Sequence, residues 1–274
     1  MKKLVTIISI ILLTFELNAQ EAEPVENNFM GTRLINGQSA NLARNGELLL
    51  LIQHRFGNIN GGFYEFFGID QATMRIGFEY GFGNNLNLGF GRSSYLKTYD
   101  IFGKYRIIQQ SSNFPITAVI TTGGSFPIIK DYFPDPYNNF SDKVSGNIQV
   151  HIAKTINKFS FQVSPGFIRT GYLTEISKDI SMFTTGLGSS FRISKDLTAN
   201  VEYLLRFNSD VPGHNPLSLG IDIHTGGHIF QIVVSNSQHM YDQAIYTSAA
   251  GDWTEGSLFL GFNLIREFKL KYYE

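Results

Sequence analysis

Residues 73–80 read TMRIGFEY, and residues 85–91 read NLNLGFG. In both stretches apolar side chains alternate with polar, charged or glycine residues, which is the period of two expected of a β-strand. One face of residues 73–80 is apolar, whereas the opposite face carries Arg75 and Glu79. A soluble half-buried strand also alternates, but a long apolar face opposite a charged one is typical of a membrane barrel with lipid outside and a polar lumen inside.

About twelve segments of the chain repeat this alternation, each close to the ~9–11 residues that a tilted membrane strand needs. They cover residues 46–56, 71–82, 85–94, 98–108, 114–122, 145–156, 158–169, 181–193, 196–207, 216–225, 227–236 and 256–268. Phe and Tyr are abundant (24 and 13 residues) and Pro is limited to 8, which favours β structure. We therefore predict an all-β fold, a single closed antiparallel transmembrane β-barrel of about twelve strands.

The connections between the predicted strands alternate in length. The even-numbered connections are short, and most carry the Gly, Asn or Ser-Lys-Asp signals of tight hairpins. The odd-numbered connections are mostly longer, above all residues 57–70, 123–144 and 237–255, while residues 95–97 break the trend. Short periplasmic turns and longer extracellular loops are typical of outer-membrane barrels. An even number of strands would then leave both chain termini in the periplasm.

The first residues of the chain have the features of a secretory signal peptide. Lys2 and Lys3 supply positive charge, residues 4–15 are apolar but too short to span a bilayer, and residues 17–19 (LNA) form a cleavage site. A retained anchor helix is the alternative, and Glu16 disfavours it by ending the apolar run. The predicted organisation is a signal peptide at 1–19, a periplasmic leader or lumen plug at 20–45 and the outer-membrane barrel at 46–274.

The composition excludes several classes of function. The chain has no cysteine, which removes disulfides, thiolate metal sites, catalytic thiols and a lipid-bearing cysteine. Its 22 basic and 23 acidic residues nearly cancel, so the basic footprint of a nucleic-acid binder is missing. After the signal segment, no stretch approaches the length of an apolar membrane-spanning helix. We therefore expect an outer-membrane location, no nucleic-acid partner and no cofactor.

The lumen face of the predicted barrel is rich in charges of both signs. Strand parity turns these side chains inward: Arg55, Arg75, Glu79, Asp100, Lys104, Arg106, His151, Arg192, Glu202, Arg206, Asp222 and His224. One interpretation is a structural network of ion pairs, because an unpaired buried charge is costly. The other is a path or binding site for a small polar solute. Eight strands are filled by side chains and roughly 16–18 leave a channel, so about twelve fit a constricted or plugged lumen.

The segment before the first strand is unlike the strands that follow. Residues 30–39 read MGTRLINGQS, which is too polar and too interrupted by glycine for a strand or helix of its own. One hypothesis is that this segment folds into the periplasmic mouth of the barrel, with Arg33 paired to an inward-facing carboxylate. The alternative is a mobile leader.

Candidate metal ligands and catalytic residues are few. His224 and His228 flank a tight turn, but two imidazoles of opposite parity make a weak site, and we predict no metal. A lipid hydrolase needs a lipid-facing Ser paired with a His and a third group that orients the imidazole. His54, Ser93 and Ser94 lie near the outer rim without a carboxylate of the same parity, so we predict no catalytic residues and no enzymatic activity.

The long loops contain aromatic, acidic and proline residues. Examples are residues 131–137 (DYFPDPY), 239–242 (HMYD) and 251–253 (GDW), the last with the single Trp. Such loops can bind a ligand or a calcium ion. They can also pack on themselves over the mouth of the barrel, which is the interpretation we favour.

Several segments together resemble an uncharacterised outer-membrane β-barrel family common in Bacteroidetes-type bacteria and known only as a domain of unknown function. The segments are 31–38 (GTRLINGQ), 53–57 (QHRFG), 89–94 (GFGRSS), 99–105 (YDIFGKY), 214–222 (HNPLSLGID) and 225–231 (TGGHIFQ). The resemblance spans nearly the whole chain after the signal segment. It implies a barrel and an outer-membrane location, and it supplies no activity, substrate or catalytic residues.

These observations lead to a porin-like membrane protein of the Gram-negative envelope. We expect it to pass or bind a small polar solute through a narrow charged lumen. The alternative is a structural barrel that docks an envelope partner through its long extracellular loops, and an outer-membrane lipid enzyme is a more distant third. The expected partners are outer-membrane lipid, the barrel-assembly machinery during insertion and the solute itself.

Overall fold

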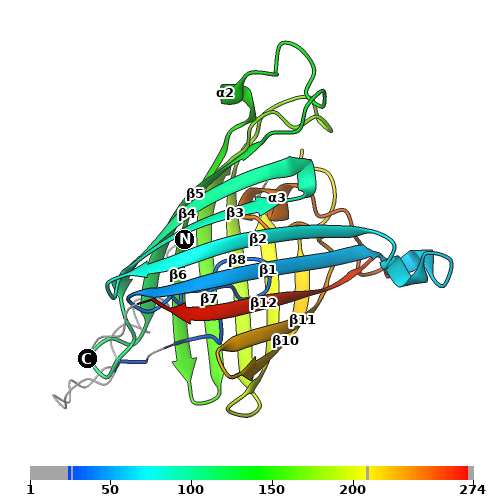
Figure 1. Cartoon of the computed structure of the whole chain (residues 1–274). Helices are drawn as coiled ribbons and strands as arrows, with labels where there is room; N and C mark the ends of the chain where they lie inside the picture. Colours follow the sequence, from blue (N-terminus) through cyan, green and yellow to red (C-terminus); the bar gives the residue numbers. More distant parts are fainter. Residues whose placement is uncertain (1–23, 26, 208–209, 271–274) are drawn as a thin grey trace, which may run out of the picture.

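The computed structural model describes residues 24–25, 27–207 and 210–270, in which twelve antiparallel strands form a closed barrel (Figure 1). Each strand pairs with its neighbours in the sequence, and the last strand pairs with the first, with Leu51 opposite Ile265. The strands are β1 (Glu47–Asn58), β2 (Ala72–Phe82), β3 (Leu86–Ser93), β4 (Thr98–Ile108), β5 (Thr117–Pro127), β6 (Ser145–Ile156), β7 (Phe159–Arg169), β8 (Ser181–Arg192), β9 (Leu197–Arg206), β10 (Leu217–Thr225), β11 (His228–Ser235) and β12 (Phe259–Lys269). The predicted fold class is confirmed.

The alternation of residue types decides which face of each strand points outward. In β2, Ile76 and Phe78 are 43% and 45% exposed, whereas Arg75 and Glu79 are buried. The same pattern holds along β1, whose inward side chains include Gln53 and Arg55. Because successive strand residues point to opposite faces, this pattern gives the barrel an apolar exterior and a polar interior.

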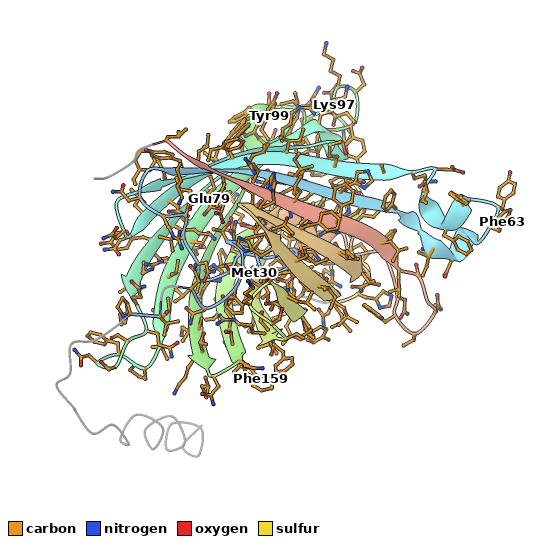
Figure 2. All side chains as sticks on the ribbon, turned by 60° about the horizontal axis from the view of Figure 1, so that its bottom comes forward. Met30, Phe63, Glu79, Lys97, Tyr99 and Phe159 are labelled. Carbon is orange, nitrogen blue, oxygen red and sulfur yellow. The ribbon has the colours of Figure 1, made fainter. Side chains whose placement is uncertain are left out.

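The two ends of the barrel differ in their connections. Residues 83–85, 157–158, 193–196 and 226–227 form tight turns at one end, which we call the short-turn end. Gly83, Asn157 and Gly226 have positive φ there, as tight turns require. Residues 59–71, 128–144, 170–180 and 236–258 connect the strands at the opposite, long-loop end. In Figure 2, Phe63 lies at the tip of a projecting loop and Phe159 lies at the short-turn end.

The described residues of the connections at the long-loop end include several short helical turns. These are η1 (Ile59–Gly61), η2 (Phe66–Gly68), η3 (Tyr95–Lys97), α2 (Phe140–Lys143) and α3 (Asp242–Thr247). In the described part of the chain, no helix has the length and hydropathy needed to cross a bilayer. The predicted signal peptide, residues 1–19, lies outside the described residues.

The strand bounds agree closely with the prediction, with one displacement. Strands β4 and β6 have the predicted bounds, but β5 runs over Thr117–Pro127 instead of residues 114–122. Gly123 and Gly124 were expected to begin a loop. They pair with Asn147 and Gly146 instead, so the β5–β6 ladder continues to Ser125 opposite Ser145. Glycine weakens a strand without ending it when both neighbouring strands remain in register.

Buried apolar residues lie inside the barrel, where they pack against a segment that is not part of the wall. Phe29, Leu34, Ala40 and Leu42 pack with Val119 and Ala153 of the wall. A second cluster joins α3 to the wall through Ile245, Tyr246, Ile168, Met182 and Leu204. The core of this protein is therefore the filled lumen itself.

Candidate functional site

The lumen is occupied by residues 28–43, which we call the inner hairpin. The chain enters at the short-turn end, where the Asn28 amide donates to Gln110 and Thr155. It reverses direction at Asn36 and Gly37, closed by an isolated bridge between Arg33 and Gln38. The inner hairpin is almost entirely buried, and its arms are joined by backbone hydrogen bonds from Leu34 N to Gly37 O and from Ser39 N to Thr32 O. The segment predicted as a leader or plug therefore lies inside the ring of strands.

The tip of the inner hairpin contacts a carboxylate of β9. Glu202 accepts hydrogen bonds from the backbone N–H groups of Asn36 (2.9 Å) and Gly37 (3.0 Å). A Cβ at position 37 would lie 2.9 Å from Glu202 Oε1, so glycine allows this close approach. The Asn36 side chain accepts from Arg55 Nη2 at 2.8 Å. Two residues predicted for the lumen, Arg55 and Glu202, thus meet at the hairpin tip.

Lys104 holds the two arms of the inner hairpin together. Its Nζ donates to the backbone carbonyls of Thr32 (2.6 Å), Ser39 (3.3 Å) and Asn41 (3.2 Å). Its acidic neighbour is Glu79, at 3.8 Å, and both side chains are fully buried. A single ammonium group therefore binds three peptide oxygens of the hairpin, of which Thr32 O also accepts from Ser39 N.

Neutral amides of the wall complete this set of contacts. Gln162 Oε1 accepts from Ala40 N, and its Nε2 donates to Gln38 O, both at 2.8 Å. Gln231 Nε2 donates to Leu34 O at 2.7 Å, and Asn263 Nδ2 donates to Ile35 O at 2.9 Å. The sequence prediction missed these amides because it selected charged residues. The available signal was the alternation within each strand, which turns these amides to the same inner face as Arg55 and Asp222.

Arg33 has an ion-pair partner that the sequence did not predict. Its Nη1 lies 3.4 Å from Oδ1 of Asp242, the first residue of α3 in the β11–β12 connection. Asp242 also accepts from Gln38 and Asn147, at 3.3 and 3.5 Å. The expected partner was an inward carboxylate of a strand. The correction is that a loop folded into the lumen supplies it, and strand parity cannot place loop residues.

A second charged group belongs to the wall alone. Arg75 Nε and Nη2 donate to the two carboxylate oxygens of Asp100, at 2.9 and 2.5 Å, and Nη1 donates to Gln53 at 3.0 Å. A Cβ at Gly91 would lie 2.3 Å from Arg75 Nη2, so glycine leaves room for the guanidinium. This contact links side chains of β1, β2 and β4 across the inner face.

The other predicted lumen residues are divided between the interior and the ends. His151 lies between Ser164 and Thr121, each at 2.9 Å, and Asp222 accepts from Gln231. Arg206 donates to Pro212, Gly213 and Tyr246 carbonyls near the long-loop end. Arg106 donates to Gln109 near a turn, and the short-turn end also carries Arg192 and His224. The residues predicted to line the lumen therefore do not form one site. They lie in the interior, at the long-loop end and at the short-turn end of the barrel.

The residues weighed for metal binding and catalysis do not come together. His228 lies 2.8 Å from Arg266 Nη1, and His54 stacks on Phe262 at a ring-centroid distance of 5.2 Å. Ser93 and Ser94 accept from backbone N–H groups of Tyr95 and Met74. Within the described ranges, no group of three or more His, Asp or Glu side chains could hold a metal ion.

The β11–β12 connection closes the long-loop end. Residues 240–247, which include α3, are buried, and Tyr246 accepts from Gln149 on β6 at 3.1 Å. His239 packs its ring on Tyr95 at a centroid distance of 4.0 Å. We call residues 236–250 the cap. Figure 1 shows α3 within the upper opening of the barrel.

The cap should weaken in mild acid because of His239. Burial lowers the pKa of this imidazole to about 4. Since the unfolded value is about 6.5, the released cap binds a proton that the closed cap does not. The contribution of His239 to the stability of the closed cap is therefore fully present above pH 6.5 and is lost as the pH falls towards 4. At pH 5 the loss is about 2 kcal/mol.

Fluorescence of Trp253, the single Trp, can measure cap release in urea at pH 7.5 and pH 5. Its indole N–H donates to Leu217 O, so its surroundings change when the connection leaves the barrel. The His239→Gln variant should show a smaller change between the two pH values. Equal pH dependence in both proteins would contradict the role of His239.

A closed antiparallel barrel with an apolar exterior and a polar interior defines an integral membrane β-barrel. The chain belongs to the family described as a membrane bound beta barrel domain (DUF5777), whose model matches residues 29–268. The resemblance to a membrane β-barrel family known only as a domain of unknown function is thus confirmed. Because the match begins at residue 29, the inner hairpin belongs to the shared domain together with the wall.

Solved structures of outer-membrane proteins are similar to this chain at low sequence identity. The NanC porin has a TM-score of 0.53 and 11% identity, covering 80% of this chain and 98% of that chain. The COG4313 outer membrane channel from Pseudomonas putida F1 has a TM-score of 0.49 and 12% identity, covering 83% and 97%. Omp33 from Acinetobacter baumannii has a TM-score of 0.47 and 9% identity, covering 81% and 98%. At 11% identity the likeness to the NanC porin shows the fold alone. No curated protein sequence matches the chain.

Proposed function

We propose that this protein is an outer-membrane barrel that passes a small polar solute once the inner hairpin leaves the lumen. In this proposal residues 1–19 direct export, residues 20–45 form a periplasmic leader that ends in the plug, and residues 46–274 form the barrel. The short-turn end then faces the periplasm with both chain termini, and the long-loop end faces outward. The proposal includes no catalysis and no cofactor.

The way in which the inner hairpin is held carries this proposal. Lys104, Gln162, Glu202, Gln231 and Asn263 contact its peptide groups through side chains, and the hairpin adds no strand to the barrel. Water or a polar solute can replace each of these contacts, since a typical intramolecular hydrogen bond is worth only about 0.5–1.5 kcal/mol net. A lumen wall with this polarity stays wetted when the hairpin leaves.

Conductance in planar bilayers tests the proposal. The chain without its signal segment should be silent, and the same chain lacking Glu23–Asn41 should give stable conductance steps. Adding Arg75→Ala and Arg206→Ala to the deletion should change the ion selectivity, because both cations would then line the open path. A folded, heat-modifiable deletion variant that stays silent would overturn the proposal.

A Ser39→Cys variant provides a second test if the deletion prevents folding. The natural chain has no cysteine, and Ser39 is fully buried in the inner hairpin. Labelling by a membrane-impermeant thiol reagent would report each withdrawal of the hairpin. If the Ser39→Cys thiol never reacted in the folded protein, even under an applied membrane voltage, the hairpin would not be a removable plug.

A docking role is the second candidate, and one loop favours it. Phe63 and Tyr64, between η1 and η2, are 81% and 94% exposed, and Phe66 and Phe67 are about half exposed. Contiguous exposed aromatic side chains often mark an interaction site. Photo-crosslinking from position 64 in intact cells would test it: a protein adduct would support docking, and adducts with lipid alone would contradict it.

A further inference from the structure

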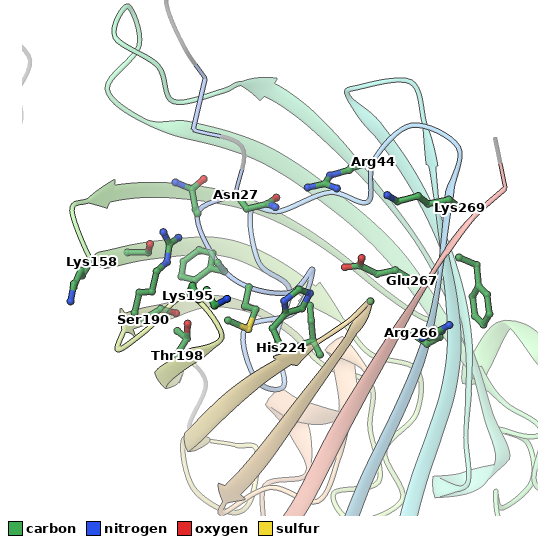
Figure 3. A pocket seen from close by; sticks show the side chains of 18 of the residues that line it. Asn27, Arg44, Lys158, Ser190, Lys195, Thr198, His224, Arg266, Glu267 and Lys269 are labelled. Carbon is green, nitrogen blue, oxygen red and sulfur yellow. The ribbon is translucent and has the colours of Figure 1, made fainter. Parts of the chain in front are cut away.

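A cavity of about 820 Å³ opens at the short-turn end beneath the inner hairpin. We call it the vestibule (Figure 3). Asn27 and Asn28 border it on the hairpin side, and the ends of β8 and β12 and the β8–β9 turn form other parts of its wall. Its volume lies in the range of small-molecule sites. The path that the proposed function requires would begin or end in this cavity.

The charge of the vestibule is strongly one-sided. Its basic lining residues are Arg44, Lys158, Arg192, Lys195, Arg266 and Lys269. Among the described lining residues, the acid is Glu267. Arg266 contributes least, because its guanidinium contacts His228 and lies over the ring of Phe268. An excess of cations remains without it.

The lumen above the vestibule has a different charge pattern. There Arg75 pairs with Asp100, Lys104 with Glu79 and Arg33 with Asp242. In the vestibule, Lys195 lies 3.8 Å from Asp196, but both side chains are half exposed or more, so this pair is weak. Arg192 is exposed to the cavity and lies across the ladder from Thr198. Pairing within the barrel therefore does not explain why Arg192 and Lys195 line the vestibule.

Hydroxyl groups and an imidazole from β7 to β10 accompany the cations. Ser160, Ser190, Thr198 and His224 line the same cavity as Arg192 and Lys195. Arginine binds phosphate and carboxylate groups through two parallel N–H donors, and lysine adds a point charge. Hydroxyl groups can bind the remaining oxygens of such a ligand. A cleft lined by one sign of charge also raises the local concentration of the opposite ion.

We propose that the vestibule binds a small free solute with two or more negative charges, carried by phosphate or carboxylate groups. Arg192 and Lys195 are its main contacts. This inference deepens the proposed function by naming the class of solute, and it rests on that function only for the direction of passage. Binding itself requires the cavity and its cations, with the inner hairpin in place.

Calorimetric titration with pyrophosphate tests the site, using the chain without its signal segment in a non-ionic detergent at low salt. We expect binding that weakens as salt rises, because exposed charges are screened. The Arg192→Gln/Lys195→Gln variant should bind about tenfold more weakly or worse. The matched control, Lys97→Gln/Lys130→Gln, removes two charges at the long-loop end and should change the affinity by less than about twofold.

Three outcomes would overturn the proposal. Pyrophosphate does not bind, or both double variants lose affinity equally, or phosphatidylglycerol in mixed micelles binds through Arg192 and Lys195 while pyrophosphate does not. The last result would assign the cations to lipid headgroups. The titration on the chain without its signal segment and the conductance of the deletion variant are separate readouts. Pyrophosphate binding with a silent deletion variant would keep this site and refute passage, whereas a conducting deletion variant and no binding by the chain that retains the hairpin would do the reverse.

Discussion

Replacing Lys104 by Met should release the inner hairpin and destabilise the protein by about 3–5 kcal/mol, the cost of breaking a buried charge pair by removing one partner. The change leaves the Glu79 carboxylate buried without its cation at 3.8 Å. It also leaves the carbonyls of Thr32, Ser39 and Asn41 without their shared donor. Methionine keeps most of the side-chain volume, so the effect is one of charge and hydrogen bonding.

Two measurements distinguish destabilisation of the barrel wall from release of the inner hairpin. Urea unfolding of the barrel gives the loss of free energy, and thiol labelling in the Ser39→Cys background gives exposure of the hairpin. The Lys104→Met/Glu79→Gln double variant should recover part of the loss, since it removes the stranded charge. Arg106→Met is the matched control, because Arg106 is partly exposed and donates to Gln109 alone among the described side chains. A loss below about 1 kcal/mol with an unreactive thiol would refute the role of Lys104.

Replacing Arg75 by Met should cost a similar 3–5 kcal/mol but leave the inner hairpin in place. Arg75 joins Asp100 through two hydrogen bonds and Gln53 through a third, all within the wall. Without the guanidinium, the buried Asp100 carboxylate loses the cation that pairs with it. Urea unfolding should therefore shift strongly, while labelling of Ser39→Cys should change little.

Lysine should not rescue position 75, because an ammonium group cannot form the paired N–H contacts with Asp100. Arg92→Met serves as the control on the outer face, where Arg92 is exposed and lies over the Tyr99 ring at 5.6 Å. Its loss should cost less than about 1 kcal/mol. If Arg75→Met exposed Ser39→Cys as strongly as Lys104→Met does, the division between wall and hairpin contacts would be wrong.

Strand identity and strand face were predictable because both depend on local alternation. Residues 98–108 and 145–156 alternate with a period of two, and this alternation decides which side chains face outward. Strands β4 and β6 have those bounds. The β5 bounds were displaced because Gly123 and Gly124 carry no side chain that could mark a face. Their pairing with Asn147 and Gly146 depends on a neighbouring strand, which local sequence does not describe.

The partners of the inward residues were much less predictable. Alternation places Lys104 and Glu202 in the lumen, but both contact the peptide groups of the inner hairpin more closely than they contact other charges. The partner of Arg33 lies 209 positions away in the sequence, in a connection that has no strand parity. The two interpretations of the lumen, ion pairs or solute path, did not include hydrogen bonds from inward side chains to the peptide groups of the plug. Much of the inward polarity instead serves a segment of the same chain.

The contacts of the inner hairpin also determine the order in which the molecule can be completed. Thr32 meets Lys104 at a separation of 72 positions, whereas Ile35 meets Asn263 at 228, near the far end of the chain. Loops of this length are slow to close, and contacts between distant residues delay folding. We therefore expect the inner hairpin to reach its final position only after β11 and β12 have formed, at the stage when β12 pairs with β1.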